Sequence, residues 1–510
     1  MILIHPPIVK PCEPPAGIAK LSGSLKRQGV KCTVLDANLE GILSLLNWSA
    51  ARDVPQRPSD RWTDRACHHL DSNMKLLTSR HGYGHMDRYK RAVRDVNRVL
   101  EVSTSHCNVR LSLSNYLDRA HSPVRSTDLM RVAEIPEENP FFPYFSKRLM
   151  DLLDKECPAM IGFSLNYLSQ ALCTFAMIGF LKLAHPHLHI ILGGGLVTSW
   201  IRNPGWSNPF KGLVDDFVAG PGEEPLLSIL GITSPGGQDS PDDAILTEEG
   251  YFSPGTILPY SASSGCYWNQ CSCCPEKAER NPYRPVSVEG MIADIRTLIV
   301  KTKPVLVHLL DNAVSPVHLE AIADRPFGAP WYGFARISPH LADLDFCIAL
   351  RRSGCVMLQL GVESGDQGVL DDMRKGFDLE KASIVLKNLK KAGIAAYAYF
   401  LFGTPTETLE KARKTLAFAV RHSDQIDFLN LAIFNLPAYG PDAPKLQTGD
   451  FYEGDLSLYR NFLHPHGWDR HHVREFVNRE FRKHPAIIPI LRKTPPMFTS
   501  NHAPFFAMRP

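Results

Sequence analysis

The segment GCYWNQCSCCPE, residues 265–276, places four of the chain's twelve cysteines at positions 266–274. Such a density occurs in disulfide knots, in zinc sites, and in centres that take three thiolates and keep a coordination position open. Thiolates are soft ligands that suit zinc or iron–sulfur clusters. A structural zinc site usually takes a second ligand pair about 12–20 residues on. Here the next histidine is His308 and the next cysteine is Cys347. The spacing therefore favours three thiolates and an open position.

The bulk composition excludes several classes of protein. At 510 residues the chain is long enough for two or three domains, and 44% hydrophobic with 21% charged residues is typical of a globular protein. A net charge of +3 gives no general case for a nucleic-acid partner. No apolar run reaches the roughly 18–20 residues of an integral membrane segment. The opening residues lack a signal-peptide pattern. Because the other cysteines are scattered singly, we expect a reducing compartment, the cytoplasm, and no disulfide knot.

The first part of the chain alternates strand-like and helical segments. Strand-like runs occur at MILIHPP (1–7), KCTVLDAN (31–38), AMIGFSLNYL (159–168) and HIILGGGLVTSW (189–200). Strands that alternate with helices predict a parallel sheet covered on both faces. We therefore predict an α/β domain over 1–232, with an insertion or helical cap at about 47–150. A linker dense in Gly, Pro, Ser and Asp follows at 233–249.

A second α/β series follows the linker. Its candidate strands are 305–311, 331–338, 356–364, 395–403 and 428–436, and helical stretches separate them. Such βα units predict a partial or complete parallel barrel over 250–430, with the active site at the carboxyl ends of its strands. The remaining residues, 431–510, are irregular, aromatic and rich in His and Pro, which predicts an α/irregular cap.

The cysteine segment resembles the cluster-binding loop of the radical SAM superfamily, usually Cys-x3-Cys-x2-Cys near the first barrel strand. The resemblance implies a [4Fe–4S] cluster on three cysteines, with S-adenosyl-L-methionine (SAM) chelating the fourth iron. It also implies reductive cleavage of SAM to methionine and a 5′-deoxyadenosyl radical. In this chain four residues separate Cys266 from Cys271, and the best register uses Cys266, Cys271 and Cys274. Cys273 then takes the family's aromatic position, and its use as a ligand in place of Cys274 stays open.

Polar residues at the predicted strand ends extend this resemblance. Asp311 in LLDNAV takes the position of a polar residue that contacts the SAM amino group in the family, and Arg336 in ARIS ends the following strand. The stretch GCVMLQLGVESGDQGVLDDMRKG (354–376) resembles the branch with N-terminal cobalamin-binding domains. That resemblance implies that Glu363 and Ser364 lie near the SAM ribose or methionine moiety.

The next predicted strand end completes the set. YFLFGTPTET resembles the adenine-contacting strand and turn of the family, with Gly403, Pro405 and Glu407. Structural roles are the alternative for all of these positions. Asp311 and Glu363 could cap helices, and Arg336 could pair with either carboxylate. Glycine at 403 could serve only a tight turn.

The N-terminal domain resembles the B12-binding Rossmann-like domain of the same branch, which implies a parallel-sheet cofactor site. Ser164 and Leu165 end one predicted strand, and Gly193, Gly194 and Gly195 follow another. Ligands of doubly wound sheets bind at such strand ends, where glycine lets the backbone approach a cofactor. The Asp-x-His-x-x-Gly signature, whose His ligates cobalt, is absent. Whether the domain binds cobalamin or has lost it stays open.

The segment HPHGWDRHHVREFVNREFRKHP (464–485) predicts a basic amphipathic helix packed on the barrel; a surface for an anionic substrate or a membrane is the alternative. The segment 495–506 is too apolar for a free tail, so we predict a lid over the strand ends, with His502 available for acid–base catalysis. Four histidines of the insertion could suggest a metal, but their spacing favours a solvated face: His68, His69, His81 and His85.

Together these features predict a radical SAM enzyme, with cobalamin-dependent methylation of an unactivated carbon as the main hypothesis. One alternative is a cyclase, rearrangement or C–C coupling enzyme that does not use cobalamin. A non-catalytic iron–sulfur or corrinoid-binding protein is the alternative of another class. The resemblance also implies an organic substrate, which the sequence does not identify, and an electron donor of the flavodoxin or ferredoxin type.

Overall fold

The computed structural model describes residues 1–50, 60–233, 240–497 and 501–508. The chain forms two compact units. The first comprises Met1–Thr256, Glu453–Ser457 and a short piece that begins at Pro496, and the second comprises Ile257–Tyr452, Leu458–Pro495 and the C-terminal residues 501–508. No helix in the described ranges combines the length and apolar character that a membrane crossing requires.

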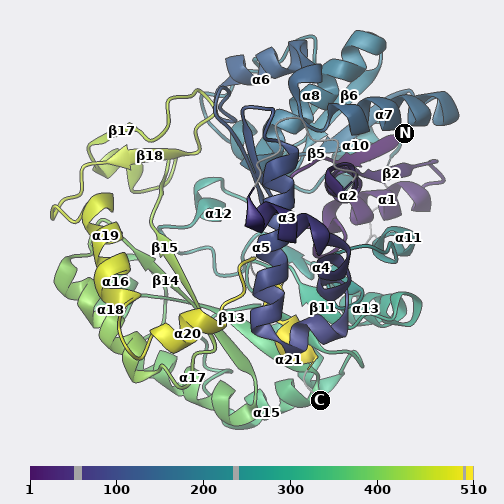
Figure 1. Ribbon diagram of the computed structural model, residues 1–510. Helices are drawn as coiled ribbons and strands as arrows, with labels where there is room; N and C mark the ends of the chain where they lie inside the picture. Colours follow the sequence, from purple (N-terminus) through teal and green to yellow (C-terminus); the bar gives the residue numbers. More distant parts are fainter. Residues whose placement is uncertain (51–59, 234–239, 498–500, 509–510) are drawn as a thin grey trace. The chain divides into compact units, whose positions relative to one another are not determined.

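The first unit is built on a five-stranded parallel sheet with the order β2-β1-β5-β6-β7 (Figure 1). Its strands are β1 (Ile2–His5), β2 (Thr33–Asp36), β5 (Met160–Ser164), β6 (His189–Gly193) and β7 (Asp216–Phe217). All four residues of β1 are buried, as expected for a strand covered on both faces. The helices that connect or follow the strands are α1 (Ala16–Arg27), α2 (Ala37–Ala50), α8 (Leu168–Ala184), α9 (Gly195–Ile201), α10 (Glu223–Ile229) and α11 (Asp243–Leu246). The predicted parallel α/β fold is confirmed.

The insertion is mostly helical. Its elements are α3 (Arg61–His68), α4 (Leu70–Leu77), η1 (Arg80–Gly84), α5 (Met86–Ser103), the hairpin β3 (Val109–Ser112) and β4 (Asn115–Asp118), α6 (Ser126–Glu134), η2 (Pro136–Glu138) and α7 (Phe142–Glu156). Residues 51–59 of the insertion and 234–239 of the predicted linker lie outside the described ranges. The linker is not wholly irregular, because it contains α11.

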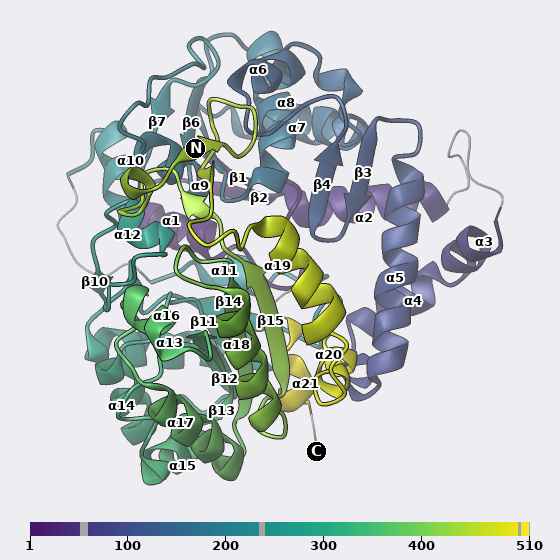
Figure 2. The same cartoon turned by 90° about the vertical axis from the view of Figure 1, so that its left-hand side faces the viewer.

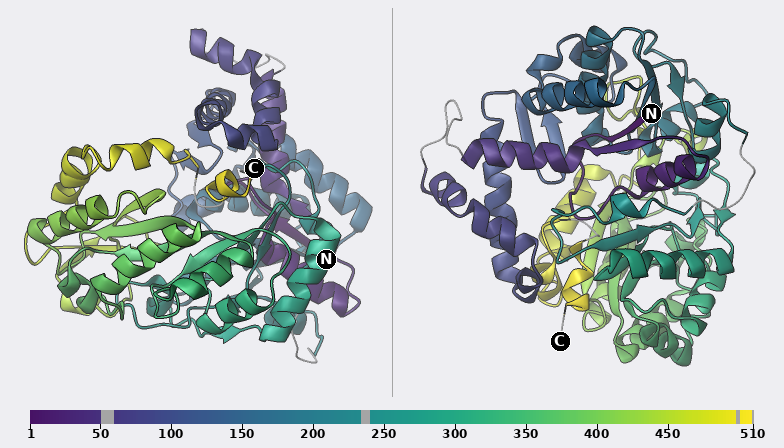
Figure 3. Two further views of the ribbon diagram at one scale, coloured as in Figure 1. Left: turned by 90° about the horizontal axis from the view of Figure 1, so that it is seen from below. Right: turned by 90° about the vertical axis from the view of Figure 1, so that its right-hand side faces the viewer.

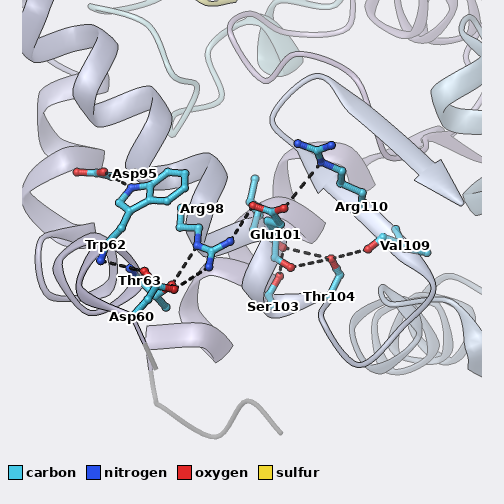
Figure 4. A network of polar contacts seen from close by, with 11 residues as sticks. Asp60, Trp62, Thr63, Asp95, Arg98, Glu101, Ser103, Thr104, Val109 and Arg110 are labelled. Carbon is cyan, nitrogen blue, oxygen red and sulfur yellow. Dashed lines mark hydrogen bonds and ion pairs between the residues drawn. The ribbon is translucent and has the colours of Figure 1, made fainter. Parts of the chain in front are cut away.

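Side-chain contacts fix α3 against α5 (Figure 4). The Asp60 carboxylate accepts the backbone N–H of Thr63 at 2.9 Å and caps α3. Arg98 on α5 pairs with Asp60 at 2.9 Å and with Glu101 at 3.1 Å. Ion pairs near the surface contribute little to stability, so these contacts mainly orient α3 relative to α5. The four insertion histidines are exposed, which confirms the predicted solvated face.

The second unit is an open, six-stranded parallel sheet with the order β15-β14-β13-β12-β11-β8. Its strands are β8 (Ile257–Tyr260), β11 (Leu306–Leu309), β12 (Trp331–Ala335), β13 (Cys355–Glu363), β14 (Ala395–Phe402) and β15 (Phe428–Ile433). Figures 2 and 3 show teal to green helices along its outer face: α13 (Val288–Thr302), α14 (Pro316–Asp324), α15 (Leu344–Arg352), α16 (Gln367–Asp372), α17 (Leu379–Ala392) and α18 (Leu409–Arg421). The sheet does not close. Of the two predicted forms, a partial or a complete barrel, the chain therefore has the partial one.

The smaller elements of this unit lie in the loops and in the C-terminal part. They are β9 (Ser263–Ser264), α12 (Pro275–Ala278), β10 (Arg284–Pro285), β16 (Leu436–Pro437), η3 (Ala443–Lys445), β17 (Thr448–Asp450), β18 (Tyr459–Phe462), α19 (Arg470–Phe476), a π-helix (Val477–Phe481), α20 (Ile488–Lys493) and α21 (Pro504–Ala507). Strands β16, β18 and β17 form a separate antiparallel sheet.

The C-terminal helix packs through its apolar face, as predicted. Val473, Phe476, Val477 and Phe481 are all buried, and the rings of Phe476 and Phe481 contact Phe402 at the end of β14. The α-helix is shorter than the predicted segment, because it changes to a π-helix at Val477.

The predicted lid position of His502 is wrong. Its ring stacks on Tyr397 near the beginning of β14, at 4.5 Å between ring centroids, and contacts Phe428, the first residue of β15. The neighbouring Ala503 belongs to a core cluster built from the first residues of the barrel strands, such as Ile257. His502 is therefore buried at the amino ends of the strands, opposite the end where a parallel barrel binds its substrate. Residues 498–500 of the same segment lie outside the described ranges.

Candidate active site

The cysteine loop leaves the sheet just after β8 and is tied to the end of β11 by Asp311. The Asp311 carboxylate accepts the backbone N–H of Ala262 at 3.0 Å and the hydroxyl of Ser263. Burial raises the pKa of Asp311, whereas these two hydrogen bonds favour the charged carboxylate. Asp311 therefore anchors the root of the loop; contact with the SAM amino group stays a prediction.

The middle of the loop lies on the turn that follows α16. The backbone N–H of Ser272 donates to the carbonyl of Met373 at 3.1 Å, and the indole N–H of Trp268 donates to the carbonyl of Arg374 at 3.0 Å. Gly376 has a positive φ of 73°, and a Cβ there would come within 2.1 Å of the Trp268 ring. Only glycine at position 376 leaves room for the indole.

Arg336, at the end of β12, contacts the same loop. Its guanidinium lies over the Trp268 ring at 4.2 Å from the centroid. One nitrogen, Nη1, donates to the sulfur of Cys271 at 3.7 Å, and the other, Nη2, donates to the carbonyl of Lys375. Arg336 therefore positions Cys271.

The four thiols of the loop are half-buried but have different neighbours. Burial raises the pKa of Cys274 to about 11, and its charged neighbours are Cys271 and Cys266. Burial also raises the pKa of Cys273, whose next-strongest interactions are with Glu363 and Lys375. Cys273 also interacts electrostatically with Cys271 and Cys274. The register with Cys266, Cys271 and Cys274 therefore stays a prediction.

The chemistry of the donor set is that of soft thiolate ligands, which suit an iron–sulfur cluster or zinc. One tetrahedral zinc ion, with Zn–S distances of about 2.3 Å, would require sulfurs within about 4 Å of one another. Among the described residues, no three Cys, His, Asp or Glu side chains are grouped to hold one metal ion. A four-iron cluster would take one thiolate on each of three irons, and the loop supplies enough cysteines for that. All twelve cysteines are described, and none forms a disulfide.

Glu363 ends β13 in an ion pair. Its carboxylate lies 3.0 Å from the Lys375 ammonium, and its backbone has a positive φ of 64°, which is rare for a residue with a side chain. A Cβ at Gly361 would lie 2.5 Å from the Glu363 carboxylate and 3.1 Å from the Lys375 nitrogen. Glycine at 361 therefore makes room for the pair. Ser364 is fully buried, and its hydroxyl contacts Thr415 at 3.2 Å, so it has a structural partner.

At the end of β14, Gly403 has a positive φ of 82°, and its N–H donates to the Glu407 carboxylate. The same carboxylate oxygen accepts the indole N–H of Trp468 at 3.0 Å. Burial raises the pKa of Glu407 to about 7, although these two hydrogen bonds each lower it. Pro405 lies half-buried in the intervening turn. Glu407 therefore fixes the turn that carries Gly403 and Pro405.

The carboxyl edge of the first unit's sheet carries the predicted cobalamin residues. The amide of Asn166 connects two loops: it donates to the Ser164 hydroxyl at 3.0 Å and accepts the N–H of Gly195 at 3.0 Å. Gly194 has a φ of 110°, and a Cβ there would lie 2.4 Å from the carbonyl oxygen of Leu165. Gly194 is thus required by the fold itself. A Cβ at Gly195 would make only ordinary van der Waals contact, with Asn166 at 3.7 Å, so the fold itself does not require glycine there.

Sequence reasoning missed several residues of this site. The structure brings the predicted ligand Cys271 close to Arg336, which follows β12. The predictions did not include Trp268, Lys375 and Gly376, which contact the same region. The stretch DDMRKG, quoted only as part of the resemblance, carried the signal for Lys375 and Gly376. Asn166 was also missed, one residue beyond Leu165. His502 is not part of the site.

Three comparisons with known proteins agree with this geometry. Residues 260–419 match the family model described as "Radical SAM superfamily". The chain is 24% identical over 303 residues to the anaerobic magnesium-protoporphyrin IX monomethyl ester cyclase of Rubrivivax gelatinosus, which covers 52% of this chain and 50% of that protein. It is 28% identical over 232 residues to the bacteriochlorophyllide d C-12(1)-methyltransferase of Chlorobaculum tepidum, covering 43% of this chain and 46% of that protein. The matches therefore span half or less of these curated relatives.

Solved structures share the fold over most of the chain. The radical S-adenosylmethionine methyltransferase TsrM from Kitasatospora setae, with a tryptophan substrate and a SAM analogue bound, matches with a TM-score of 0.55 and 14% identity, covering 89% of this chain and 79% of that one. The cobalamin-dependent radical enzyme OxsB, with aqua-cobalamin and SAM bound, matches with a TM-score of 0.51 and 15% identity, covering 83% and 52%. Residues 260–419 are thus similar to the radical SAM superfamily, and the fold of the chain is shared with TsrM and OxsB.

Proposed function

We propose that this protein is a radical SAM enzyme, and that it is a cobalamin-dependent methyltransferase acting on an unactivated carbon of an organic substrate. The observation that carries the proposal is the cysteine loop, fixed at the carboxyl ends of the strands by Asp311, Arg336 and the turn after α16. Cys266, Cys271 and Cys274 would hold the [4Fe–4S] cluster. When bound, the cluster supplies the electron that cleaves SAM.

The residues of this chain would position and shield that centre. Arg336 and Lys375 contribute positive charge beside the cysteine loop, where it would offset part of the negative charge of thiolates bound to a cluster. Glu363 and Gly403 occupy two strand ends of the partial barrel where the superfamily binds SAM. Both lie on rigid elements, since Glu363 is paired with Lys375 and the Gly403 turn is fixed by Glu407.

The proposed cobalamin site is the carboxyl edge of the N-terminal sheet. Ser164, Gly193 and Gly195 lie at the carboxyl ends of β5 and β6, where doubly wound sheets bind cofactors. When bound, cobalamin carries the methyl group that is transferred. The fold shared with TsrM and OxsB supports this assignment, and so does the methyltransferase named among the relatives.

A radical SAM cyclase or coupling enzyme that does not use cobalamin is the second candidate. The cyclase named among the relatives supports it, because that protein is similar over half of this chain. We also propose an electron donor of the flavodoxin or ferredoxin type, since the cluster needs a one-electron reductant of low potential.

The test is anaerobic reconstitution with iron and sulfide, followed by electron paramagnetic resonance of the reduced protein with and without SAM. We expect about four irons per chain, and a cluster signal that changes when SAM is added, because SAM would occupy the open iron. Cys274→Ser should lose the signal, whereas Cys273→Ser should keep it. The proposal is contradicted if the cluster signal does not change when SAM is added, or if Cys274→Ser still gives the signal.

A further inference from the structure

A cavity of about 620 Å³ lies within the second unit, beside the end of β14. Its wall consists of Gly403, Gln447, Thr448, Gly449, Asn461, Phe462, Leu463, His464, Trp468, Asp469, Arg470, His471 and Arg474. Small-molecule sites in proteins typically have volumes of about 300–1,000 Å³. Gly403 is the only residue predicted to contact SAM that lines this cavity, so the cavity is distinct from the cysteine loop.

Two arginines give the wall its positive charge. Arg470 donates to the carbonyl of Phe434 at 2.9 Å and to the side-chain oxygen of Asn435 at 2.6 Å, and its guanidinium lies 4.9 Å from the centre of the Phe451 ring. These partners are neutral and leave its charge uncompensated. Arg474, one turn further along α19, is exposed. Among the described residues, neither arginine forms an ion pair with a carboxylate.

Of the other ionisable groups of the wall, Asp469 carries a negative charge that offsets part of this positive charge, and His464 is neutral. The Asp469 carboxylate accepts the backbone N–H groups of His471 and His472 at 2.9 and 3.0 Å and contacts the His472 ring at 2.9 Å. The His464 ring accepts backbone N–H groups at Nδ1 and lies 2.9 Å from the Thr404 carbonyl through Nε2, which requires the neutral imidazole. Its pKa is lowered by burial, which agrees with that form.

The two arginines also repel one another. Burial and the neighbouring Arg474 both lower the pKa of Arg470. Two like charges on one wall are unfavourable unless an anion lies between them. Beside them, the rings of Phe462 and Trp468 provide an apolar surface, and Trp468 is held in place by Glu407. The wall thus combines a cationic pair with aromatic faces.

We propose that this cavity is a binding site for an organic anion, which places a carboxylate or phosphate against Arg470 and Arg474 and an apolar part against Phe462 and Trp468. Guanidinium groups bind both oxyanions through paired hydrogen bonds. The proposed anion contacts involve none of the predicted cluster ligands, and the probes are tested without SAM, so this test is separate from that of the proposed function.

The test uses the full chain and three fluorinated probes of one shape: 4-fluorobenzoate, 4-fluorophenyl phosphate and the neutral 4-fluorobenzamide. Ligand-observed fluorine NMR at constant ionic strength measures each affinity. We expect at least one anion to bind saturably and at least about tenfold more tightly than the amide. Whichever anion binds more tightly identifies the preferred oxyanion.

Variants then locate the binding. Arg474→Gln should weaken anion binding at least about fivefold, and Arg474→Lys should keep most of it, because the charge remains. Arg479→Gln is the matched control: Arg479 is exposed on the following π-helix, pairs with Glu475 and does not line the cavity. The proposal is overturned if neither anion binds, if the amide binds as tightly, or if a folded Arg474→Gln protein binds as the wild type does.

Discussion

The ion pair of Lys375 and Glu363 gives the cysteine loop a charged neighbour that is largely buried. Lys375 is 8% exposed and interacts electrostatically with Cys271 and Cys273 as well as with Glu363. Electrostatic interactions are stronger in such an environment than in water. With three thiolates bound to iron, a fixed cation at this position stabilises the more negative, reduced form of the cluster.

Replacing Lys375 by Met should therefore lower the midpoint potential of the reconstituted cluster. Lys375→Arg should keep the wild-type value, because it keeps the charge, and so should Arg374→Gln, since Arg374 is exposed. A potentiometric titration followed by electron paramagnetic resonance measures the shift. An unchanged potential in Lys375→Met, with iron content intact, would show that Lys375 has only a structural role.

Glu407 makes the stability of the fold depend on pH. Burial raises its pKa from 4.5 to about 7 in the folded protein. A carboxyl group whose pKa is raised on folding favours the folded state at low pH, and this contribution is lost as the pH rises through the folded pKa. The shift corresponds to a loss of about 2–3 kcal/mol between pH 4.5 and 8.

Glu407→Gln removes the ionisation and keeps an oxygen for Trp468. Relative to wild type, the variant should therefore gain about 2–3 kcal/mol in free energy of unfolding between pH 5 and pH 8. Urea unfolding at the two pH values measures the difference. A difference between the two proteins that stays constant with pH contradicts the assignment.

For single residues, the sequence identified those at strand ends but not the side chains that contact them. Asp311 and Arg336 were found because they directly follow runs that read as strands. Trp268 and Lys375 were not singled out, because their role depends on a loop and a turn about 100 residues apart in the chain that meet only in the fold.

Among the elements, the turn after α16 holds the cysteine loop through Trp268. The indole donates to Arg374, packs on Gly376 and lies under Arg336. Trp268→Ala should leave the loop less ordered, since it removes all three contacts, and should lower the iron bound per chain after reconstitution.

Trp268→Phe should bind more iron than Trp268→Ala, because it keeps a ring under Arg336. Trp62→Ala, at a half-exposed tryptophan of the first unit, serves as the matched control and should bind iron as the wild type does. If Trp268→Ala reaches the wild-type iron content with an unchanged melting temperature, the contacts of Trp268 have no role in cluster binding.

Strands and helices of the two sheets were predictable because their apolar patterns are regular. The C-terminal segment was not. The apolar composition of 495–506 showed correctly that it is buried, but composition does not tell which end of a barrel it covers. The rings of Tyr397 and Phe428 at the amino ends of β14 and β15 decide the position of His502.

For the whole molecule, cobalamin binding by the first unit separates the methyltransferase proposal from its alternative. Gly195→Leu should fold normally, because a Cβ at this position meets nothing within 3.7 Å. Its larger side chain should obstruct the carboxyl edge of the sheet and reduce retention of hydroxocobalamin, measured by absorbance after gel filtration.

Gly194→Ala provides the contrast, since its Cβ would collide with the backbone of Leu165 and should destabilise the fold. If the wild type retains no hydroxocobalamin, the cobalamin-independent alternative is favoured. If folded Gly195→Leu retains as much as the wild type, the cofactor does not bind at this edge.

The central claim is reductive cleavage of SAM at the cysteine loop. The most direct measurement is mass spectrometry of 5′-deoxyadenosine formed by the anaerobically reconstituted protein with SAM and dithionite. Cys271→Ala is the test variant, and Cys157→Ala, at an exposed cysteine of the first unit, is the control. We predict deoxyadenosine from the wild type and from Cys157→Ala, and none from Cys271→Ala. Deoxyadenosine from Cys271→Ala at the wild-type level, or none from a wild type whose cluster binds SAM, would contradict the claim.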